Sequence, residues 1–422
     1  MPTARRKPRS APPATPPRRS GRPRIGLALA GGGPLGAIYE IGALCALEES
    51  ITGLDFCDCD SYIGISAGGF IAAGLANGMG PRMLSAAFIE NSAPAPDSFD
   101  PAELMHPAWA EYGERLRLLP GLLKSAVWDH WMEGRSLMGA FERLGRALPT
   151  GLLSGDALEA QIRRQFALPG RSNDFRELGR RLVLVATDLD SGEAVPFGLP
   201  GWDDVPISRA VQASAALPGL FPPVKIAGRH YVDGALKKTL HASLLLQEGV
   251  DLLICLNPLV PYESDREHPL AQQMPARGQG PQETSIPHLV DGGLPLVMSQ
   301  TFRSLIHSRL ELGMKRYEHT HPGTDILLFE PDHRDAEMFL ANTFSYSQRR
   351  HLAEHAYQTT RARLRRRAPK LQAALQRHGL SLNLEALNEP GRRLLSEPAA
   401  TRTEDALRRL RAALSLLEAR HA

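Results

Sequence analysis

Two glycine-rich turns, each placed between a strand-like run and a helix-compatible segment, most constrain the fold of this chain. The first, Gly31-Gly32-Gly33-Pro34-Leu35-Gly36, follows the apolar run Ile25–Ala30. The second, Gly64-Ile65-Ser66-Ala67-Gly68, follows Asp60-Ser61-Tyr62-Ile63. Successive strand–turn–helix units are typical of parallel sheets. The sequence therefore predicts a three-layer α/β/α fold with a mainly parallel central sheet and helices on both faces.

The second turn has the G-x-S-x-G pattern of a nucleophile elbow. Small residues around Ser66, above all Gly64 and Gly68, allow a sharp strand-to-helix turn that lifts the hydroxyl clear of the sheet. The first turn can offer free backbone N–H groups at a helix start, where negative charge is stabilised. Its candidate anion-binding residues are Gly31, Gly32, Gly33 and Gly36. A nucleophile and an anion cradle together indicate acyl transfer.

Each turn taken alone has another interpretation. Gly31, Gly33 and Gly36 also fit the G-x-G-x-x-G dinucleotide fingerprint, which wants an acidic residue about 20 positions further on, at the end of the second strand. The acids available, between Asp55 and Asp60, lead straight into the serine turn instead. The G-x-S-x-G pattern can also be a small-residue turn that packs a helix closely.

A third element favours the hydrolase interpretation. Residues 182–197 read LVLVATDLDSGEAVPF, and residues 210–235 read AVQASAALPGLFPPVKIAGRHYVDGA. With the two turns, in this order over about residues 24–256, the chain resembles the patatin-like phospholipases. The resemblance implies that Ser66 is the nucleophile, that Asp233 is its only partner and that the first turn supplies the oxyanion hole. It also implies a lipid or phospholipid substrate, with no metal and no cofactor.

The chemistry of such a dyad sets a condition on Asp233. A serine hydroxyl is a poor nucleophile until a base takes its proton. Aspartate is a weak base at its usual pKa of about 3.9, so burial would have to raise that pKa. Gly234 permits a tight turn that could aim the carboxylate inward. Two alternatives stay open: an ordinary hairpin turn at Asp233-Gly234, and a Ser-His-Asp triad that uses His241 or His230.

The sequence departs from the family pattern at two positions. Leu35 stands where the family usually carries Arg or Lys, just before the last glycine of the first turn. Lys237-Lys238-Thr239-Leu240-His241 follows the D-G-A motif where many members continue with Asn and Pro. Neither departure removes a catalytic atom. They motivate a second hypothesis, a catalytically silent lipid-binding or scaffolding homologue.

Composition bounds the domain organisation. A chain of 422 residues that is 43% hydrophobic and 23% charged is long enough for one large globular domain with an appendage. Eight basic residues and no acid lie in the first 24 positions, so the net charge of +3 becomes negative without them. We expect a disordered, basic, Pro-rich tail over 1–24, the hydrolase domain over 25–256 with a lid-like helical insertion at 82–181, a loop, helix and strand over 257–345, and a helical extension over 346–422.

The basic tail over 1–24 and the helical insertion over 82–181 are the segments that could contact lipid. The tail lacks the apolar core of a secretory signal; anionic lipid is a candidate partner for it, a solvated tail is the alternative, and no nucleic-acid partner is expected. The insertion carries Trp109, Trp128 and Trp131, which would face lipid in a lid or pack in a core. Pro120-Gly121 predicts a break into two helices there.

The remaining segments carry weaker signals. Expected elements are a strand over 250–257, a loop over 258–296, a helix over 297–319, a strand over 325–330, and helix from Ser347 on with a solvated basic face at Arg361–Arg367. His351-Leu-Ala-Glu354-His355 matches the H-x-x-E-H zinc pattern but falls in a polar stretch. The apolar stretches 25–47 and 61–81 read as buried segments rather than membrane spans. Four cysteines without a paired metal motif indicate a reducing, cytoplasmic setting, with peripheral membrane contact as an option.

Overall fold

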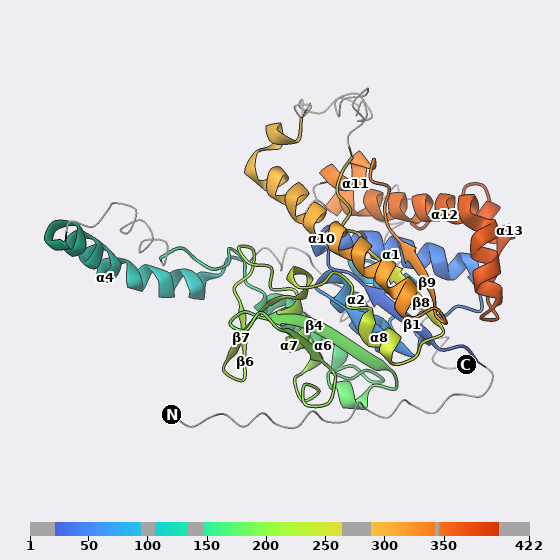
Figure 1. Cartoon of the computed structure of the whole chain (residues 1–422), viewed down its shortest axis with the longest axis horizontal. Coiled ribbons are helices and arrows are strands. Elements are labelled where there is room, and N and C mark those ends of the chain that lie inside the picture. The colour runs from blue at the N-terminus through green and yellow to red at the C-terminus, as the bar shows by residue number, and fades with distance from the viewer. Residues whose placement is uncertain (1–21, 94–105, 134–146, 264–287, 342–345, 396–422) are drawn as a thin grey trace, which may run out of the picture.

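The computed structural model describes residues 22–93, 106–133, 147–263, 288–341 and 346–395 (Figure 1). A central sheet runs in the order β6-β7-β4-β3-β1-β8-β9, with β5 also paired to β4. Its strands are β1 (Ile25–Leu29), β3 (Ser61–Gly64), β4 (Arg181–Asp188), β5 (Ala194–Phe197), β6 (Val224–Ile226), β7 (Arg229–Asp233), β8 (Leu252–Leu256) and β9 (Asp325–Phe329). Strands β4, β3, β1, β8 and β9 are mutually parallel, whereas β5 and β7 are antiparallel to β4, and β6 to β7. The mainly parallel sheet is confirmed.

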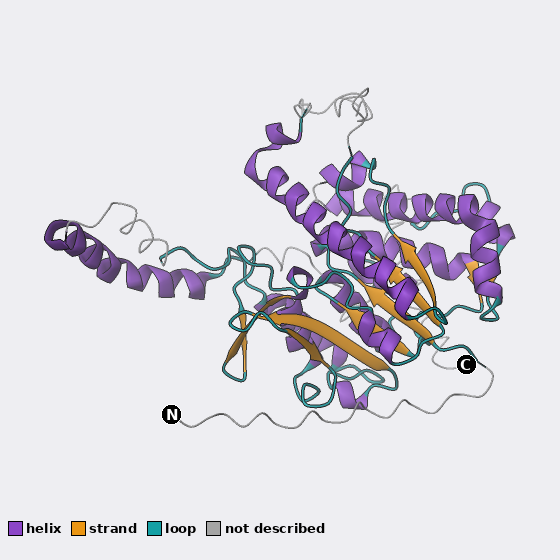
Figure 2. Cartoon of the chain, in the orientation of Figure 1, coloured by secondary structure: helices purple, strands orange, loops and turns teal. Residues whose placement is uncertain are grey.

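The central strands are apolar on both sides because helices cover both faces of the sheet (Figure 2). Alternate residues of β1 show this, since Leu27 and Leu29 belong to one buried cluster and Ala28 to the other. The helices on the first face include α1 (Gly33–Ser50), α2 (Ala67–Ala76), α6 (Asp156–Phe166), α7 (Ile207–Ser214) and α12 (Tyr346–Gln376). The second face carries α8 (Ser243–Gln247) and α10 (Gly293–Thr320).

The C-terminal helices are part of this body. Helix α12 packs along α1, where a Cβ at Gly42 would meet the Ala353 carbonyl oxygen at 2.5 Å. The short strands β2 (Ile51–Thr52) and β10 (Ser381–Leu382) pair antiparallel, and α13 (Leu384–Asn388) follows. Smaller elements complete the described chain: α3 (Pro81–Ser85), a π-helical turn η1 (Ala86–Glu90), η3 (Phe175–Glu177), η4 (Gly234–Leu236), η5 (Leu289–Gly292) and α11 (Ala336–Leu340).

Helix α4 (Trp109–Glu133) corrects the expected break, since it continues through Pro120. Proline removes one backbone N–H and frees the carbonyl four residues earlier. That carbonyl belongs to Leu116, which is 65% exposed, so water can satisfy it. Trp109 is also exposed, and no residue of 109–121 is buried. The side chains of Trp128 and Trp131 lie outside the described part of the chain.

Two further expectations need correction. The loop over 258–296 is shorter than expected, because η5 begins at Leu289 and α10 at Gly293, while 264–287 lies outside the description. The basic run on α12 is not uniformly solvated, since Arg361 is 2% exposed. Its guanidinium donates to the carbonyls of Ala386 and Leu387 at the end of α13, at 2.7 and 3.1 Å. Orphan carbonyls at a helix end are natural acceptors for a cation.

The strands over 250–257 and 325–330 and the helix from Ser347 are present. Among the described residues, no helix combines the length and the apolar character needed to cross a membrane. Residues 1–21 of the expected tail and residues 396–422 of the expected extension lie outside the described ranges.

Candidate active site

Ser66 lies at the turn between β3 and α2, with a backbone conformation that few residues other than glycine adopt. Its φ is 54° and its ψ −124°. The turn is tight because glycines let backbone approach backbone. A Cβ at Gly64 would lie 2.5 Å from the Gly68 carbonyl oxygen, and one at Gly68 would lie 2.5 Å from that of Ala30. Strain of this kind is concentrated at functional sites and persists only where the surroundings enforce it.

A second serine, Ser214, is hydrogen-bonded to the backbone of this turn. The Ser66 N–H donates to Ser214 Oγ at 2.8 Å, and Ser214 Oγ donates to the Val185 carbonyl at 2.6 Å. Ser214 is fully buried at the end of α7, and Val185 lies in β4. Ser214 is not among the residues predicted from the sequence, although it lies inside the third element that carries the family resemblance. Nothing local marks it, because the buried residues of α7 also include Ser208 and Gln212.

Asp233 ends β7 beside Ser66. Its Oδ1 accepts a hydrogen bond from the Ala235 N–H at 2.8 Å, and the Ser66 hydroxyl lies close enough to the carboxylate to lower the pKa of Asp233. Gly234 is required next to it, because a Cβ there would lie 2.2 Å from the Val185 carbonyl oxygen. Asp233 is 3% exposed. Burial raises its pKa to about 6, against the lowering effects of the Ala235 N–H and the Ser66 hydroxyl.

The first glycine turn lies against the serine turn. A Cβ at Gly31 would be 3.1 Å from Ser66 Cβ. Gly32 and Gly36 pack on Pro258. A Cβ at Gly32 would lie 2.6 Å from Pro258 Cγ, and a Cβ at Gly36 would lie 2.9 Å from it. Gly33 has a φ of +60° and begins α1. The first-turn amides of a helix have no intrahelical acceptor, so those of this turn are available to another acceptor.

Histidine does not join the pair in this arrangement. His241 is 6% exposed, and its Nε2 has no hydrogen-bond partner among the described residues. Burial lowers the pKa of His241 to about 3, while a hydrogen bond to the Gly234 backbone opposes that shift. His230 lies earlier in β7, opposite Lys225 of β6. The structure thus brings together Ser66, Asp233 and the glycine turn, and leaves the imidazole of His241 neutral, with its Nε2 unpartnered among the described residues.

The H-x-x-E-H residues are engaged locally. His355 Nε2 lies 2.7 Å from Asp335 Oδ2, and His351 pairs with Glu337. Glu354 accepts from the Leu394 N–H at 2.9 Å. Within the described ranges no group of three or more His, Cys, Asp or Glu side chains is arranged to hold a metal ion.

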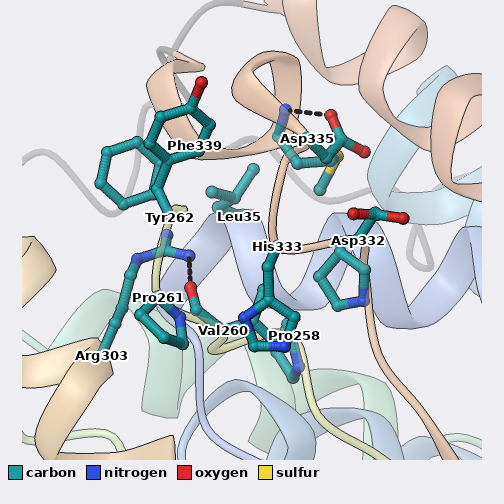
Figure 3. A pocket seen from close by; sticks show the side chains of 12 residues that line it. Leu35, Pro258, Val260, Pro261, Tyr262, Arg303, Asp332, His333, Asp335 and Phe339 are labelled. Carbon is teal, nitrogen blue, oxygen red and sulfur yellow. Dashed lines mark hydrogen bonds between the residues drawn. The ribbon is translucent and has the colours of Figure 1, made fainter. Parts of the chain in front are cut away.

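A pocket beside the first turn contains Leu35 together with a buried cation (Figure 3). The Arg303 guanidinium donates Nη1–H to the Val260 carbonyl at 3.2 Å and lies 5.0 Å from the centre of the Phe339 ring. Burial lowers the Arg303 pKa to about 10. Phe339 in turn stacks on Tyr262, with ring centres 5.2 Å apart. The position that usually carries Arg or Lys in the family is therefore apolar here, but a cation from α10 lines the same pocket.

A family model described as patatin-like phospholipase matches residues 27–246. The match covers more than half of the chain and includes both glycine turns and Asp233. The chain belongs to the patatin-like phospholipase family.

Three solved structures resemble the chain more distantly. VipD from Legionella pneumophila is 19% identical over 58% of this chain and 51% of its own, with a TM-score of 0.31. The type III effector protein ExoU is 17% identical over 82% and 53%, with a TM-score of 0.33. A heterodimeric complex of ExoU with SpcU from Pseudomonas aeruginosa matches at 19% identity over 93% and 67%, with a TM-score of 0.24. The chain spans about half the length of the first two structures.

Proposed function

We propose that the protein is a serine acyl hydrolase that cleaves lipid esters with a Ser66–Asp233 dyad. The observation that carries the proposal is the placement of the Ser66 hydroxyl beside a buried carboxylate whose pKa is raised to about 6. A carboxylate with that pKa is a stronger base than an exposed aspartate, yet it stays mostly ionised at neutral pH. The unpartnered Nε2 of His241 supports a dyad rather than a triad.

The reaction follows from these positions. Asp233 takes the hydroxyl proton while Ser66 Oγ bonds to the ester carbonyl carbon, and the carbonyl oxygen becomes an oxyanion. The amides around Gly32 and Gly33 stabilise that charge; one such donor contributes about 3–4 kcal/mol. The bond to the alkoxy leaving group breaks and Asp233 returns its proton to the departing alcohol. Water then attacks the acyl-enzyme, Asp233 takes a proton from it, and the fatty acid leaves as Ser66 regains its hydrogen.

Exposed apolar residues near Asp233 support a lipid as the substrate. The Asp233 N–H donates to the Ala216 carbonyl at 3.0 Å, and Leu217, which follows, is 41% exposed. The segment that begins at Leu217 is hydrogen-bonded to the loop that contains Leu152. The Leu152 N–H donates to the Leu220 carbonyl at 3.0 Å. Leu152 is 55% exposed. An apolar rim of this kind suits a substrate with acyl chains.

Replacing the base separates the dyad from the triad. Asp233→Asn should lower kcat/KM on a soluble acyl ester by about 10²–10⁴-fold, the usual range for loss of a general base. His241→Gln, which keeps a hydrogen-bonding group in the same space, should leave kcat/KM within about threefold. Circular dichroism would verify that both variants fold. A folded His241→Gln protein as inactive as Asp233→Asn would replace the dyad with a triad.

The raised pKa of Asp233 predicts a definite pH profile. The base acts as a carboxylate, so kcat/KM should fall about tenfold per pH unit below pH 6, rather than below the ordinary aspartate range near pH 4. The measurement is kcat/KM for a soluble ester between pH 4.5 and 8, over which folding is monitored in parallel. A profile that stays flat down to pH 4.5 would contradict the assignment of Asp233 as the base.

A folded wild-type protein that turns over no soluble or micellar ester would contradict the hydrolase proposal. That outcome would favour the catalytically silent lipid-binding alternative, for which Leu35 is the motivating departure.

A further inference from the structure

Helix α10 exposes large apolar side chains along one side. Leu294 is 73% exposed, Phe302 44%, Leu305 56% and Leu312 68%. At 100° per residue these side chains, together with Val297 and Met298, fall on one face of the helix. The opposite face carries Leu310, which is buried against the sheet. A largely apolar face of this length on an exposed helix, interrupted by the small side chains of Thr301 and Ser308, marks an interaction surface.

Charge divides this face into two halves. From Gly292 to Ser308, Arg303 is the one Lys, Arg, Asp or Glu residue, and its side chain is buried. Further along, Arg309, Lys315 and Arg316 are exposed beside Leu312 on the same side of the helix. Among the described residues, no carboxylate lies within ion-pair distance of these three cations. The acids of this half, Glu311 and Glu318, flank Lys315 at the edge of this face, four residues before it and three after it. The outward face of α10 is therefore apolar and uncharged first, then basic.

The middle of α10 lies against the segment that follows the candidate base. Arg309 Nη1 donates to the Leu236 carbonyl at 3.1 Å, and Thr239 Oγ1 donates to the Ile306 carbonyl at 3.3 Å. Residues 236–239 directly follow Asp233 and Gly234. Figure 1 shows the first half of α10 extending beyond the sheet and its covering helices. A surface that bound the outward face would thus be held close to the segment that carries the candidate base.

We propose that the outward face of α10 docks the protein on an anionic lipid bilayer. The choice of a lipid surface rests on the proposed acyl hydrolase function, because the substrate would lie in that surface. The apolar half suits the boundary between headgroups and acyl chains, and the basic half suits anionic headgroups, as in interfacial amphipathic helices. A second copy of the chain fits less well, since a two-fold pairing of this face would bury exposed cations that form no ion pair among the described residues.

The test measures vesicle binding of the full-length chain. Cosedimentation would use vesicles of phosphatidylcholine alone and vesicles of phosphatidylcholine with phosphatidylglycerol, in a Ser66→Ala background so that the lipid stays intact. Leu294→Ser with Phe302→Ser should weaken binding to the mixed vesicles about tenfold or more. Lys315→Glu with Arg316→Glu should weaken it about tenfold or more on mixed vesicles and leave binding to pure phosphatidylcholine unchanged.

Matched controls lie elsewhere on the surface. Leu384→Ser replaces a leucine that is 54% exposed on α13, and Arg366→Glu with Arg367→Glu reverses two exposed cations on α12. Both should bind within about twofold of the parent. Vesicle binding that survives both α10 double variants would overturn the proposal, as would binding that is lost only when residues 1–21 are removed. Concentration-dependent dimers that the Leu294/Phe302 variant abolishes, without vesicle binding, would assign the face to a second copy.

Failure of this proposal can be told apart from failure of the proposed function. The α10 variants in the active background should hydrolyse a soluble ester at the wild-type rate, because no α10 side chain takes part in the reaction. Wild type that binds vesicles through α10 but hydrolyses no ester would leave the docking surface standing and remove the hydrolase. Wild type that hydrolyses the soluble ester but binds no vesicle would leave the hydrolase standing and remove the docking surface.

Discussion

Ser66→Ala should abolish ester turnover, lowering kcat by at least about 10³-fold, the scale on which loss of a catalytic nucleophile acts. The reason is that alanine leaves Asp233 and the glycine turn in position but removes the oxygen that forms the covalent bond. Initial rates with a soluble ester, together with a thermal unfolding curve, would measure the effect. Turnover above one-tenth of wild type in pure, folded Ser66→Ala would contradict the role of Ser66.

Ser61→Ala is the matched control for that variant. Ser61 lies at the start of β3, the strand that leads to Ser66, and is 1% exposed. Its Oγ has no hydrogen-bond partner among the described residues. The substitution therefore removes an equally buried hydroxyl from the same strand without touching the dyad. We expect wild-type kcat within about twofold, because a core hydroxyl that makes no hydrogen bond contributes little.

Gly68→Ala should destabilise the protein by about 3 kcal/mol or more, near or above the usual range for overpacked cores. The new methyl group would lie 2.5–2.6 Å from the backbone of Leu29 and Ala30. Backbone cannot rotate aside as a side chain can, so α2 would have to move away from β1 and carry Ser66 with it. Chemical denaturation would measure the loss of unfolding free energy, and activity should fall with it.

Gly113→Ala, at a second helical glycine, should not destabilise the protein. Gly113 lies in α4, and no atom comes within 4 Å of the Cβ that alanine would add. Alanine is favoured over glycine in a helix by about 1 kcal/mol, so this variant should unfold no more easily than wild type. A Gly68→Ala protein as stable as Gly113→Ala would show that the serine turn tolerates movement and is not sterically enforced.

The candidate site was predictable because glycine marks it in the sequence. Gly64, Gly68 and Gly234 are needed where backbone approaches backbone, and such positions punctuate the chain between strands and helices. The apolar runs around them predicted the parallel strands and the layered fold. Asp233 was found through the motif rather than through physical reasoning, because its raised pKa depends on burial that only the tertiary structure creates.

Other features left no readable signal. Ser214 reaches Ser66 across 148 positions of sequence, and nothing local distinguishes it from other helical serines. Arg361 looks like any residue of a basic run until α13 folds back and presents carbonyls to it. Pro120 stays inside α4 because the exposed surface there lets water replace a hydrogen bond. Each case depends on what a residue meets after folding, which composition and periodicity do not encode.

Mapping a fluorophosphonate adduct on the wild-type chain would test the central claim most directly. Such probes react with activated serine hydroxyls, so digestion and mass spectrometry of the labelled protein identify the serine by its position. The account predicts a single adduct on Ser66 that is strongly reduced in Asp233→Asn. An adduct on another serine, or no adduct on folded protein that hydrolyses a soluble ester, would contradict it.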